Sequence, residues 1–289
     1  MQQNNLHKTC ILTYDIEEWF QVENLKGAIT RKDWELQKST VEKNTDRILG
    51  ILEEFNILAT FFILGWVAER HPALVKKIYA AGHEIACHGY GHELANILEE
   101  NQIRQDIQKS KKILEDLISE PVVGYRAPNF SISDQIISYL KEMDFVYDSS
   151  YNPFTLNPRY GSLSVLQKKV APNCYLIENG LYEIPISYTS IIKFSLPISG
   201  GAYFRIIPFW IFKRLINSNQ VKNTPNIFYL HPWEFEPEQP RIRNIKWNYQ
   251  FRHYYGLKNT KNKLRKLIIH LKDLKGDFLT MQQYIKGIC

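Results

Sequence analysis

An alternation of two hydrophobic periods runs through almost the whole chain and limits what it can fold into. Short apolar runs typical of buried strands alternate with segments whose apolar residues recur at helical spacing. The expected strands are residues 10–14, 59–64, 84–87, 122–125, 145–147, 181–186, 227–230 and 278–280. This alternation predicts β-α-β units and a mainly parallel sheet, and seven or so strands with short connections favour an α/β fold closed into a (β/α) barrel.

Three helices are expected between these strands, centred on residues 48–55, 103–117 and 136–143. Between residues 149 and 179 the alternation gives way to Asn, Pro, Ser and Gly, which predicts a long excursion within the domain, since the alternation resumes afterwards. No linker or short repeat is visible. We therefore expect a single domain over residues 1–289, with a basic C-terminal segment, residues 241–289, packing on it.

Composition narrows the class of protein. The chain has 289 residues, of which 44% are apolar and 23% charged, as in ordinary globular proteins. No apolar stretch approaches the roughly 20 residues of a membrane span, and the polar start has no apolar signal-peptide core behind it. The four cysteines lie far apart without a C-x-x-C pair, so reduced thiols are expected. These features predict a soluble, cytoplasmic protein.

The net charge of +6 is unevenly placed. Residues 241–275 carry 11 Lys or Arg against one acid, Asp273. Within them, residues 260–275 have helically spaced Leu and Ile, which predicts an outer barrel helix with a solvated basic face. The alternative is peripheral contact with an anionic membrane, or with a lipid-linked sugar, through clustered cations. Nucleic acid is not an expected partner, because no recognised binding module is visible.

Ionisable side chains follow five of the expected strands where each strand ends. They are the group from Asp15 to Glu18, the pair His88 and His92, Arg126, Asp148, and the stretch from His231 to Glu234. The carboxyl ends of strands in a parallel barrel converge on one face, where the loops build the active site. We therefore expect these five clusters to meet in one cleft.

His88 and His92 are candidate metal ligands. Their four-residue spacing puts both imidazoles on one side if they lie on a helical turn. A catalytic zinc takes three protein ligands and keeps a position for water, so a carboxylate is the expected third ligand. In an extended strand Asp15 and Glu17 point to the same face. One of them is expected to bind the metal, and the other to handle protons.

The remaining clusters complete the set needed for metal-assisted hydrolysis. A metal lowers the pKa of bound water to about 7, and a neighbouring carboxylate takes its proton. His231 suits protonation of the leaving group, because an unperturbed histidine has a pKa of about 6.5. Asp148 is expected to hold the tautomer of His231, and Arg126 to orient the base carboxylate and keep it ionised.

Five motifs of the chain resemble those of the polysaccharide deacetylases, the NodB-homology or fourth carbohydrate esterase family. The motifs are Thr13 to Glu17, His88 to His92, Arg126 to Pro128, Asp148 to Ser150, and Leu230 with His231. The resemblance runs from about residue 9 to residue 233 and implies a distorted (β/α) barrel that removes N-acetyl or O-acetyl groups from sugars with a divalent metal. Further stretches, Gly200 to Arg205 and Phe251 to Tyr254, resemble the subgroup that accompanies exosortase and exopolysaccharide gene clusters.

The resemblance also implies a role for each residue. It makes Asp15 the general base, His88 and His92 metal ligands, and His231 the general acid. It implies further that Arg126 positions Asp15, that Asp148 tunes His231, and that the backbone N–H of Asn129 helps to hold the oxyanion. One departure stands out: where most members have a second Asp after the base, this chain has Ile16. We interpret Glu17 as the shifted ligand, with a water in its place as the alternative.

Together these patterns predict a metal-dependent hydrolase, with Zn²⁺ as the expected cofactor, that removes N-acetyl groups from a glycan or a lipid-linked sugar. One alternative is a related barrel amidohydrolase that opens an imide or ureide. Another is a barrel that binds glycan without cleaving it. The aromatic residues expected near the barrel mouth fit either sugar stacking or packing; they are Trp19, Phe20, Trp34, Tyr90, Phe130 and Trp233.

Overall fold

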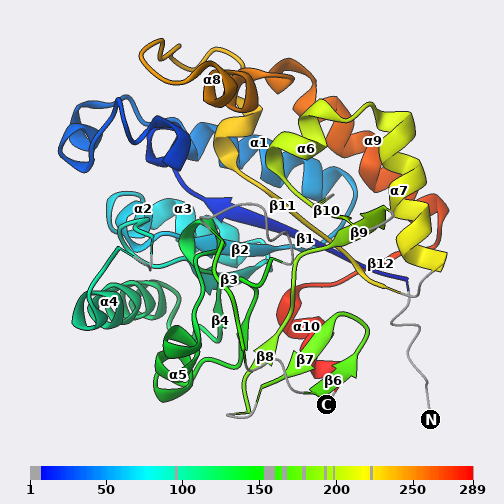
Figure 1. The fold of residues 1–289 in the computed structure, drawn as a ribbon, viewed down its shortest axis with the longest axis horizontal. Coiled ribbons are helices and arrows are strands. Elements are labelled where there is room, and N and C mark those ends of the chain that lie inside the picture. The colour runs from blue at the N-terminus through cyan, green and yellow to red at the C-terminus, as the bar shows by residue number, and fades with distance from the viewer. Residues whose placement is uncertain are drawn as a thin grey trace.

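The computed structural model describes residues 8–94, 97–152, 160–164, 168–177, 180–191, 194–197, 199–221 and 224–288. A curled mixed sheet forms its centre, with helices packed around the outer face (Figure 1). The expected α/β fold with a distorted barrel is confirmed. Each of the eight expected strands has a counterpart in the structure.

Nine strands follow one another along the sheet. Their order is β11 (Asn226–Leu230), β1 (Thr9–Ile16), β2 (Thr60–Ile63), β3 (Glu84–Cys87), β4 (Gly124–Tyr125), β5 (Tyr147–Asp148), β8 (Tyr182–Glu183), β7 (Cys174–Leu176) and β6 (Lys168–Ala171). Pairing is parallel from β11 to β8 and antiparallel for β7 and β6, while β12 (Asp277–Phe278) pairs in parallel with the start of β1. The ends of the parallel strands therefore lie at one face, as expected.

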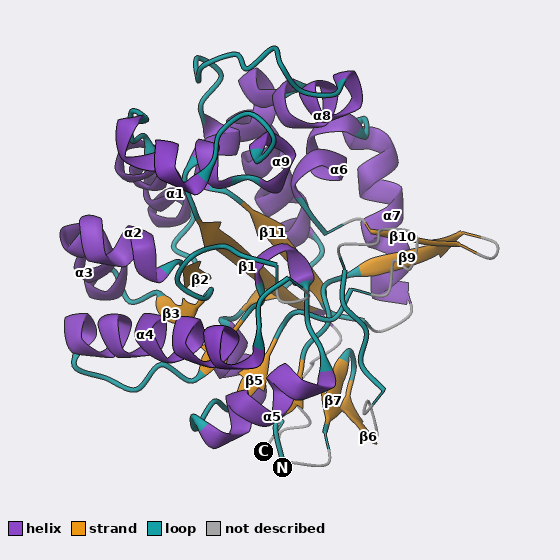
Figure 2. Cartoon of the chain, turned by 60° about the vertical axis from the view of Figure 1, so that its left-hand side comes forward, coloured by secondary structure: helices purple, strands orange, loops and turns teal. Residues whose placement is uncertain are grey.

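The sequence predicts a long irregular segment between residues 149 and 179. The described part of this segment instead contains the β6–β7 hairpin. β6 begins with exposed lysines, Lys168 and Lys169, so it lacks the apolar alternation that marks a strand in a sequence. A second hairpin, β9 (Tyr188–Ile191) with β10 (Phe194–Pro197), projects beside α7 (Figure 2). Residues 153–159, 165–167 and 178–179 lie outside the described residues.

The helices connect the strands and cover the outer face. They are α1 (Val41–Glu54), α2 (Gly65–Arg70), α3 (Pro72–Ala80), α4 (Glu100–Ile118), α5 (Asp134–Glu142), α6 (Gly201–Ile206), α7 (Phe209–Val221), α8 (Trp247–Tyr254), α9 (Thr260–Asp273) and α10 (Met281–Lys286). The three expected helices correspond to α1, α4 and α5, whose helically spaced apolar residues are buried. In the described part of the chain, no helix is long and apolar enough to cross a membrane.

Side chains of β1 alternate between two hydrophobic clusters, one on each face of the strand. This alternation determines the face on which the functional side chains lie. Leu12, Tyr14 and Ile16 pack with the helices, whereas Ile11 packs in the barrel interior with Met281 and other residues of α10. Side chains alternate between the two faces of a strand. The face that carries Ile11 also carries Asp15, which leaves this acid on the inside of the barrel.

The elements after residue 241 pack against the barrel. α9 buries Leu264, Leu267, Ile268 and Leu271 in the main core, as expected for an outer barrel helix. On its other side, Arg265 Nε donates to Glu54 Oε2 of α1 at 2.8 Å. The described cysteines, Cys10, Cys87 and Cys174, are buried and form no disulfide within the described residues, while Cys289 lies outside them.

Candidate active site

The first two acids of the site come from the end of β1. Asp15 is the penultimate residue of the strand and Glu17 follows it directly; both are buried and both line one cavity. Ile16, between them, packs in the helix-side core. Because the intervening residue points to the opposite face, the second carboxylate at this strand end is at position 17 instead of 16.

Three donor groups converge beside this strand end. Glu17, His88 and His92 are buried, and one ligand atom from each lies within 4.8 Å of the others. His88 Nδ1 lies 2.8 Å from the backbone carbonyl of Arg126. Since a carbonyl can only accept, Nδ1 carries the proton and Nε2 keeps its lone pair, the usual arrangement of a metal-binding histidine.

The two histidines lie on a loop and not on the expected helical turn. His92 has a left-handed φ of +53°, and Gly89 has φ +71°. Asp106 of α4 fixes the loop by accepting hydrogen bonds from the backbone N–H groups of Tyr90 (2.6 Å) and Gly91 (2.9 Å). A Cβ at position 89 would lie 2.7 Å from Asp106 Oδ2, so glycine is required there. Sequence reasoning missed Asp106, which has the appearance of an ordinary helix-surface acid.

Burial and the charges of neighbouring groups set the pKa values within the donor cluster. Burial alone would raise the pKa of Glu17, but the positive charges of His92 and His231 outweigh it and lower this pKa to about 2. Burial lowers the pKa of His88 to about 4. Burial acts in the same direction on His92, but the charge of Glu17 raises its pKa above the ordinary value. The cluster therefore contains an ionised carboxylate and an imidazole that is neutral near pH 7.

Arg126 holds Asp15 in place. It follows β4, is fully buried, and donates from Nη1 to Asp15 Oδ1 at 2.8 Å and to Thr13 Oγ1 at 2.7 Å. Its Nε donates to the Ser149 carbonyl at 3.0 Å. A guanidinium fixed on several sides orients one carboxylate oxygen of Asp15.

His231 stands opposite the two acids, at the end of β11. Its Nε2 lies 3.8 Å from Asp15 Oδ2 and 3.7 Å from Glu17 Oε1. Its Nδ1 donates to Glu234 Oε2 at 3.2 Å. Burial lowers the pKa of His231, but the charges of Glu17, Glu234 and Asp15 outweigh burial and raise it to about 9. The imidazole is therefore protonated near neutrality.

The partner of His231 differs from the prediction, which assigned that place to Asp148. Asp148 accepts hydrogen bonds from Ser150 N (3.1 Å) and Ser150 Oγ (2.5 Å), and it pairs across the sheet with Glu183 of β8. Burial raises the pKa of Asp148. The side chain thus belongs to the β5–β8 contact, and the carboxylate that holds the tautomer of His231 is Glu234.

A local helix signal places Glu234. The short helix η6 (Pro232–Phe235) begins with proline, and its third residue, Glu234, also accepts the backbone N–H of His231 at 3.0 Å. Proline at the first position and an acid at the third are standard features of a helix start. The His-Pro-Trp-Glu stretch therefore contained the signal that could have assigned Glu234.

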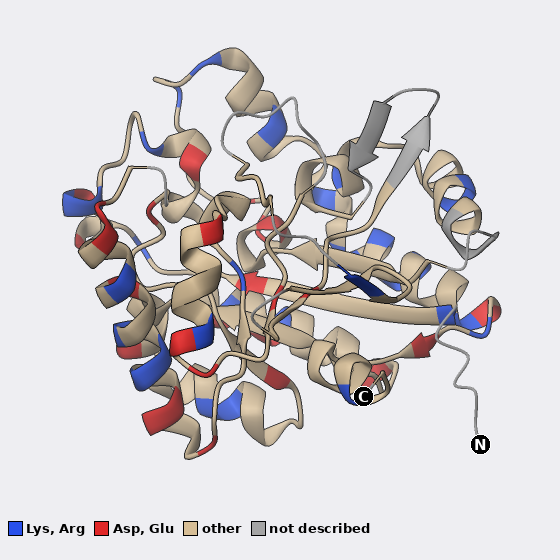
Figure 3. Ribbon diagram, turned by 60° about the horizontal axis from the view of Figure 1, so that its bottom comes forward, with Lys and Arg blue, Asp and Glu red and all other residues tan. Residues whose placement is uncertain are grey.

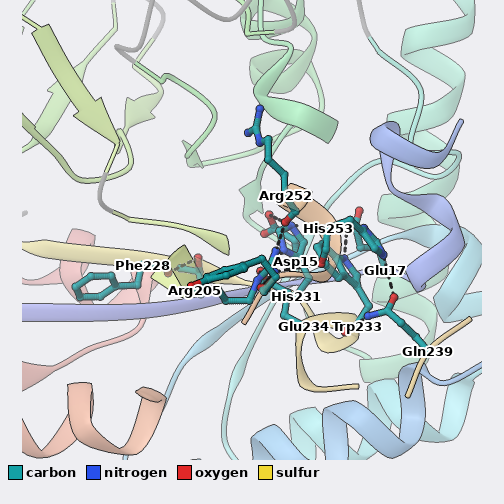
Figure 4. Close-up of polar contacts among 12 residues, drawn as sticks. Asp15, Glu17, Arg205, Phe228, His231, Trp233, Glu234, Gln239, Arg252 and His253 are labelled. Atoms are coloured by element: carbon teal, nitrogen blue, oxygen red, sulfur yellow. Dashed lines mark hydrogen bonds and ion pairs between the residues drawn. The ribbon is translucent and has the colours of Figure 1, made fainter. Parts of the chain in front are cut away.

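Residues from the second half of the chain form the wall behind His231 (Figure 4). Arg205 of α6 donates from Nε to Glu234 Oε1 at 2.8 Å and from Nη1 to the His253 carbonyl at 3.1 Å. Burial raises the pKa of Glu234, but the charges of Arg205 and His231 reverse the effect and lower it. Trp233 stacks on the ring of His253 and donates from Nε1 to Glu17 Oε1 at 3.0 Å.

These groups surround a cavity of about 110 Å³. The residues lining it include Asp15, Glu17, His88, His92, Asn129, Phe130, Arg205, Tyr229, His231, Trp233, Glu234 and Arg252. Four of the five expected clusters meet here, through Asp15 and Glu17, the two histidines, His231, and Arg126 behind Asp15. Among the aromatic residues, Phe130 and Trp233 line the cavity, whereas Trp19, Phe20 and Trp34 are buried as packing residues.

Comparison with known proteins divides the chain into two parts. Residues 4–147 match a family model described as polysaccharide deacetylase, and residues 149–286 match one described as a domain of unknown function, DUF3473. A peptidoglycan-N-acetylglucosamine deacetylase of Bacillus cereus is 33% identical over 101 residues, which are 35% of this chain and 47% of that protein. A peptidoglycan deacetylase of Helicobacter pylori is 32% identical over 159 residues, or 51% of this chain and 54% of that protein. The chain thus spans about half the length, or less, of these relatives.

Solved structures share the fold over nearly the whole chain. A candidate polysaccharide deacetylase from Mycobacterium smegmatis has a TM-score of 0.64 at 24% identity, covering 98% of this chain and 91% of that one. The Puue allantoinase has a TM-score of 0.61 at 16% identity, covering 99% and 91%. A CE4 family pseudoenzyme from Bacillus anthracis has a TM-score of 0.54 at 15% identity, covering 96% and 65%. One fold thus occurs in proteins with different descriptions, so the site and not the fold must indicate the chemistry.

Proposed function

We propose that this chain is a metal-dependent hydrolase that removes the N-acetyl group from a sugar, since residues 4–147 match the polysaccharide deacetylase family model. The convergence of Glu17, His88 and His92 beside Asp15 and His231 is the observation that carries the proposal. The set contains a metal-binding cluster, a carboxylate base and a protonated acid around one cavity, as hydrolysis of an amide requires.

The donor set fits a divalent cation. Glu17 Oε2 lies 2.7 Å from His92 Nε2, yet among the described residues it has no hydrogen bond of normal geometry. This close approach of two buried ligand atoms, with no well-aligned hydrogen bond between them, fits a positive ion shared by Glu17 and the two imidazoles. Two histidines and one carboxylate are a ligand set found in catalytic zinc sites, and we assign zinc on that ground. A bound cation would polarise the acetamide carbonyl and make a water more acidic.

The side chains of this protein then move two protons. Asp15, held by Arg126, takes a proton from the attacking water on the acid side of the cavity. His231 gives the proton of its Nε2 to the leaving nitrogen, so that acetate and the free amine are formed. Glu234 keeps Nδ1 of His231 protonated and its ring oriented. The backbone N–H of Asn129, a residue that lines the cavity, helps to stabilise the negative oxygen of the intermediate.

We propose membership of the subgroup that accompanies exosortase gene clusters because of the stretches Gly200 to Arg205 and Phe251 to Tyr254, and one residue from each contributes to the contacts behind the active site. Arg205 comes from the first stretch and His253 from the second, and the Arg205 guanidinium donates to the His253 carbonyl. The substrate we propose is an N-acetylated sugar within an exopolysaccharide or its lipid-linked precursor.

Acetate release tests this function. The purified chain is incubated with N-acetylglucosamine oligomers, with an imide and with a ureide, each before and after chelation. We expect acetate from the oligomers only, loss of activity with the chelator, and recovery with Zn²⁺. Ring opening of the imide or ureide without acetate would instead support the amidohydrolase alternative. Full activity after metal removal would contradict both the deacetylase proposal and the amidohydrolase alternative. Glycan binding without any turnover would support the non-catalytic alternative.

A further inference from the structure

α8 presents large aromatic side chains to solvent on one face. Trp247 is 80% exposed and Phe251 is 45% exposed; Tyr255, directly after the helix, is 47% exposed. These residues follow one another at intervals of four, and Tyr255 N donates to the Phe251 carbonyl, which continues the helical spacing. Residues four apart lie on the same side of a helix. The three rings thus form an aromatic row, whereas isolated exposed apolar residues are common and need no explanation.

Cations accompany this aromatic row. Residues 239–272 contain ten Lys or Arg and no Asp or Glu. Figure 3 shows the Lys and Arg of the described chain in blue and its acids in red. Arg243 and Lys246, just before α8, are exposed. We call Trp247, Phe251, Tyr255, Arg243 and Lys246 the α8 patch.

α9, the helix on which the sequence placed the membrane alternative, is less suited to such a contact. Its Arg265 pairs with Glu54, and its Lys263 lies against the rings of Phe204 and Phe212. Its apolar face is buried in the core. The cations of α9 are thus partly engaged within the protein, and the α8 patch is the stronger candidate surface.

The α8 patch lies next to the mouth of the active-site cavity. Arg252, on the same helix, lines that cavity. α8 also packs against the short helix η3 (Glu23–Leu25), whose Glu23 and Asn24 line it too. A surface that binds the patch would therefore lie near the entrance of the active site.

We propose that the α8 patch docks the protein on an anionic phospholipid surface. Trp and Tyr rings favour the headgroup level of a bilayer, where their apolar body is buried and their polar group stays wet, and Phe251 adds an apolar contact. Lys and Arg beside them gain attraction from anionic headgroups. A neutral polysaccharide would match the rings but would leave the cations without a counter-charge, so the bilayer matches both features. This binding is independent of the proposed hydrolysis.

Flotation of the full chain with lipid vesicles tests the proposal. We expect binding to vesicles that contain phosphatidylglycerol, little binding to pure phosphatidylcholine vesicles, and weaker binding as salt is raised. The double variant Trp247→Ser with Phe251→Ser is expected to bind about tenfold more weakly, because the apolar contact with the interface is lost. Arg243→Gln with Lys246→Gln is expected to bind about 30-fold more weakly, from about a fivefold attraction per cation.

Two control variants remove exposed groups elsewhere. Leu36→Ser removes an apolar side chain that is 82% exposed, and Lys112→Gln removes an exposed cation of α4. Both are expected to bind like the unmodified chain, and circular dichroism checks the fold of every variant. His231→Ala should also bind vesicles normally, which separates a failure here from a failure of the proposed function.

Three results would overturn the docking proposal. The first is equal binding to neutral and anionic vesicles, and the second is unchanged binding by both α8 double variants. The third is the absence of vesicle binding together with binding of a soluble acidic polysaccharide that the α8 variants abolish, which would assign the patch to a polymer.

Discussion

The two halves of the chain build the same cavity in different ways. Up to residue 147, the functional side chains stand at or just after the ends of parallel strands of one sheet: Asp15 and Glu17 at β1, His88 after β3 and Arg126 after β4. Beyond residue 149, His231 also follows a strand, but Arg205 and His253, which form its surroundings, come from separate helices. The first half relies on the sheet, and the second half relies on the packing of distant segments.

Because of this difference, substitutions in the two halves of the site should have different effects. Hydrogen bonds fix the spacing of neighbouring strands at about 4.8 Å, so β2, which lies between β1 and β3, sets the separation of the donor groups that follow those two strands. The surroundings of His231 depend on long-range contacts, and here its partner is Glu234 instead of Asp148. We therefore expect changes of the donor residues Glu17, His88 and His92 in the first half to abolish metal binding, and changes of His231 and Glu234 in the second half to alter proton transfer.

The largest expected effect is that of His88→Ala. The variant removes one of three donors, so it should lose the bound metal and lower kcat by about 10³-fold or more. Metal analysis of the purified protein and acetate release measure the two effects. His71→Ala, which removes an imidazole that pairs with Glu42 outside the cavity, is the matched control and should keep both. Retention of one metal per chain by His88→Ala would place the ion elsewhere.

A smaller effect is expected for His231→Ala, in the second half. The variant should keep its metal, because His231 is outside the donor cluster, and should lose about 10²- to 10⁴-fold in kcat as the proton donor disappears. Metal content and turnover of the same preparation check both parts. A wild-type rate would show that another group protonates the leaving nitrogen.

Glu234→Gln should have a moderate effect, about 10- to 100-fold in kcat, with metal retained. Glu234 raises the pKa of His231, so its neutralisation should lower that pKa. An acid must be protonated to act, and activity should therefore fall at a lower pH on the alkaline side of the pH profile. Asp148→Asn is the comparison. If Asp148→Asn shifted the alkaline limb and Glu234→Gln did not, the original assignment of Asp148 would be right.

The smallest expected effect is on stability, at the junction of the two halves. Asp148 of β5 faces Glu183 of β8, and burial together with the Asp148 charge holds the pKa of Glu183 well above its ordinary value. Below the ordinary pKa both folded and unfolded chains are protonated, so nothing is lost. As the pH rises above it, the unfolded chain ionises first and stability falls until the folded-state pKa is passed.

Glu183→Gln should remove this loss. We expect the variant to exceed the unmodified chain in unfolding free energy at pH 8 by on the order of 1–2 kcal/mol, and the difference should shrink toward pH 4. Urea unfolding at several pH values measures it, with the exposed Glu53→Gln as control. A difference that does not change with pH would argue against a protonated Glu183 in the folded chain.

Much of the first half could be predicted from the sequence. The strand runs were apolar enough to be recognised, and parallel strands necessarily bring their carboxyl ends together. The face shared by Asp15 and Glu17 followed from the two-residue period of a strand. The helical turn expected for His88 and His92 was wrong, because the left-handed backbone at Gly89 and His92 has no clear sequence signal.

The second half was harder to predict. The sequence does not show which acid is the partner of His231, because Asp148 and Glu234 both lie at or after the end of a strand. In the structure Asp148 pairs across the sheet with β8, and Glu234 accepts from His231. Arg205 could not be connected to Glu234 either, because they are 29 positions apart and meet only through packing. The β6 strand lacked apolar alternation and was expected as irregular chain.

Anomalous diffraction at the zinc edge, from crystals grown with Zn²⁺, would locate the metal. We expect one strong peak bounded by Glu17, His88 and His92, with Asp15 outside the inner ligands and held by Arg126. A peak away from this cluster, or one bound through Asp15 while Glu17 points elsewhere, would contradict the account.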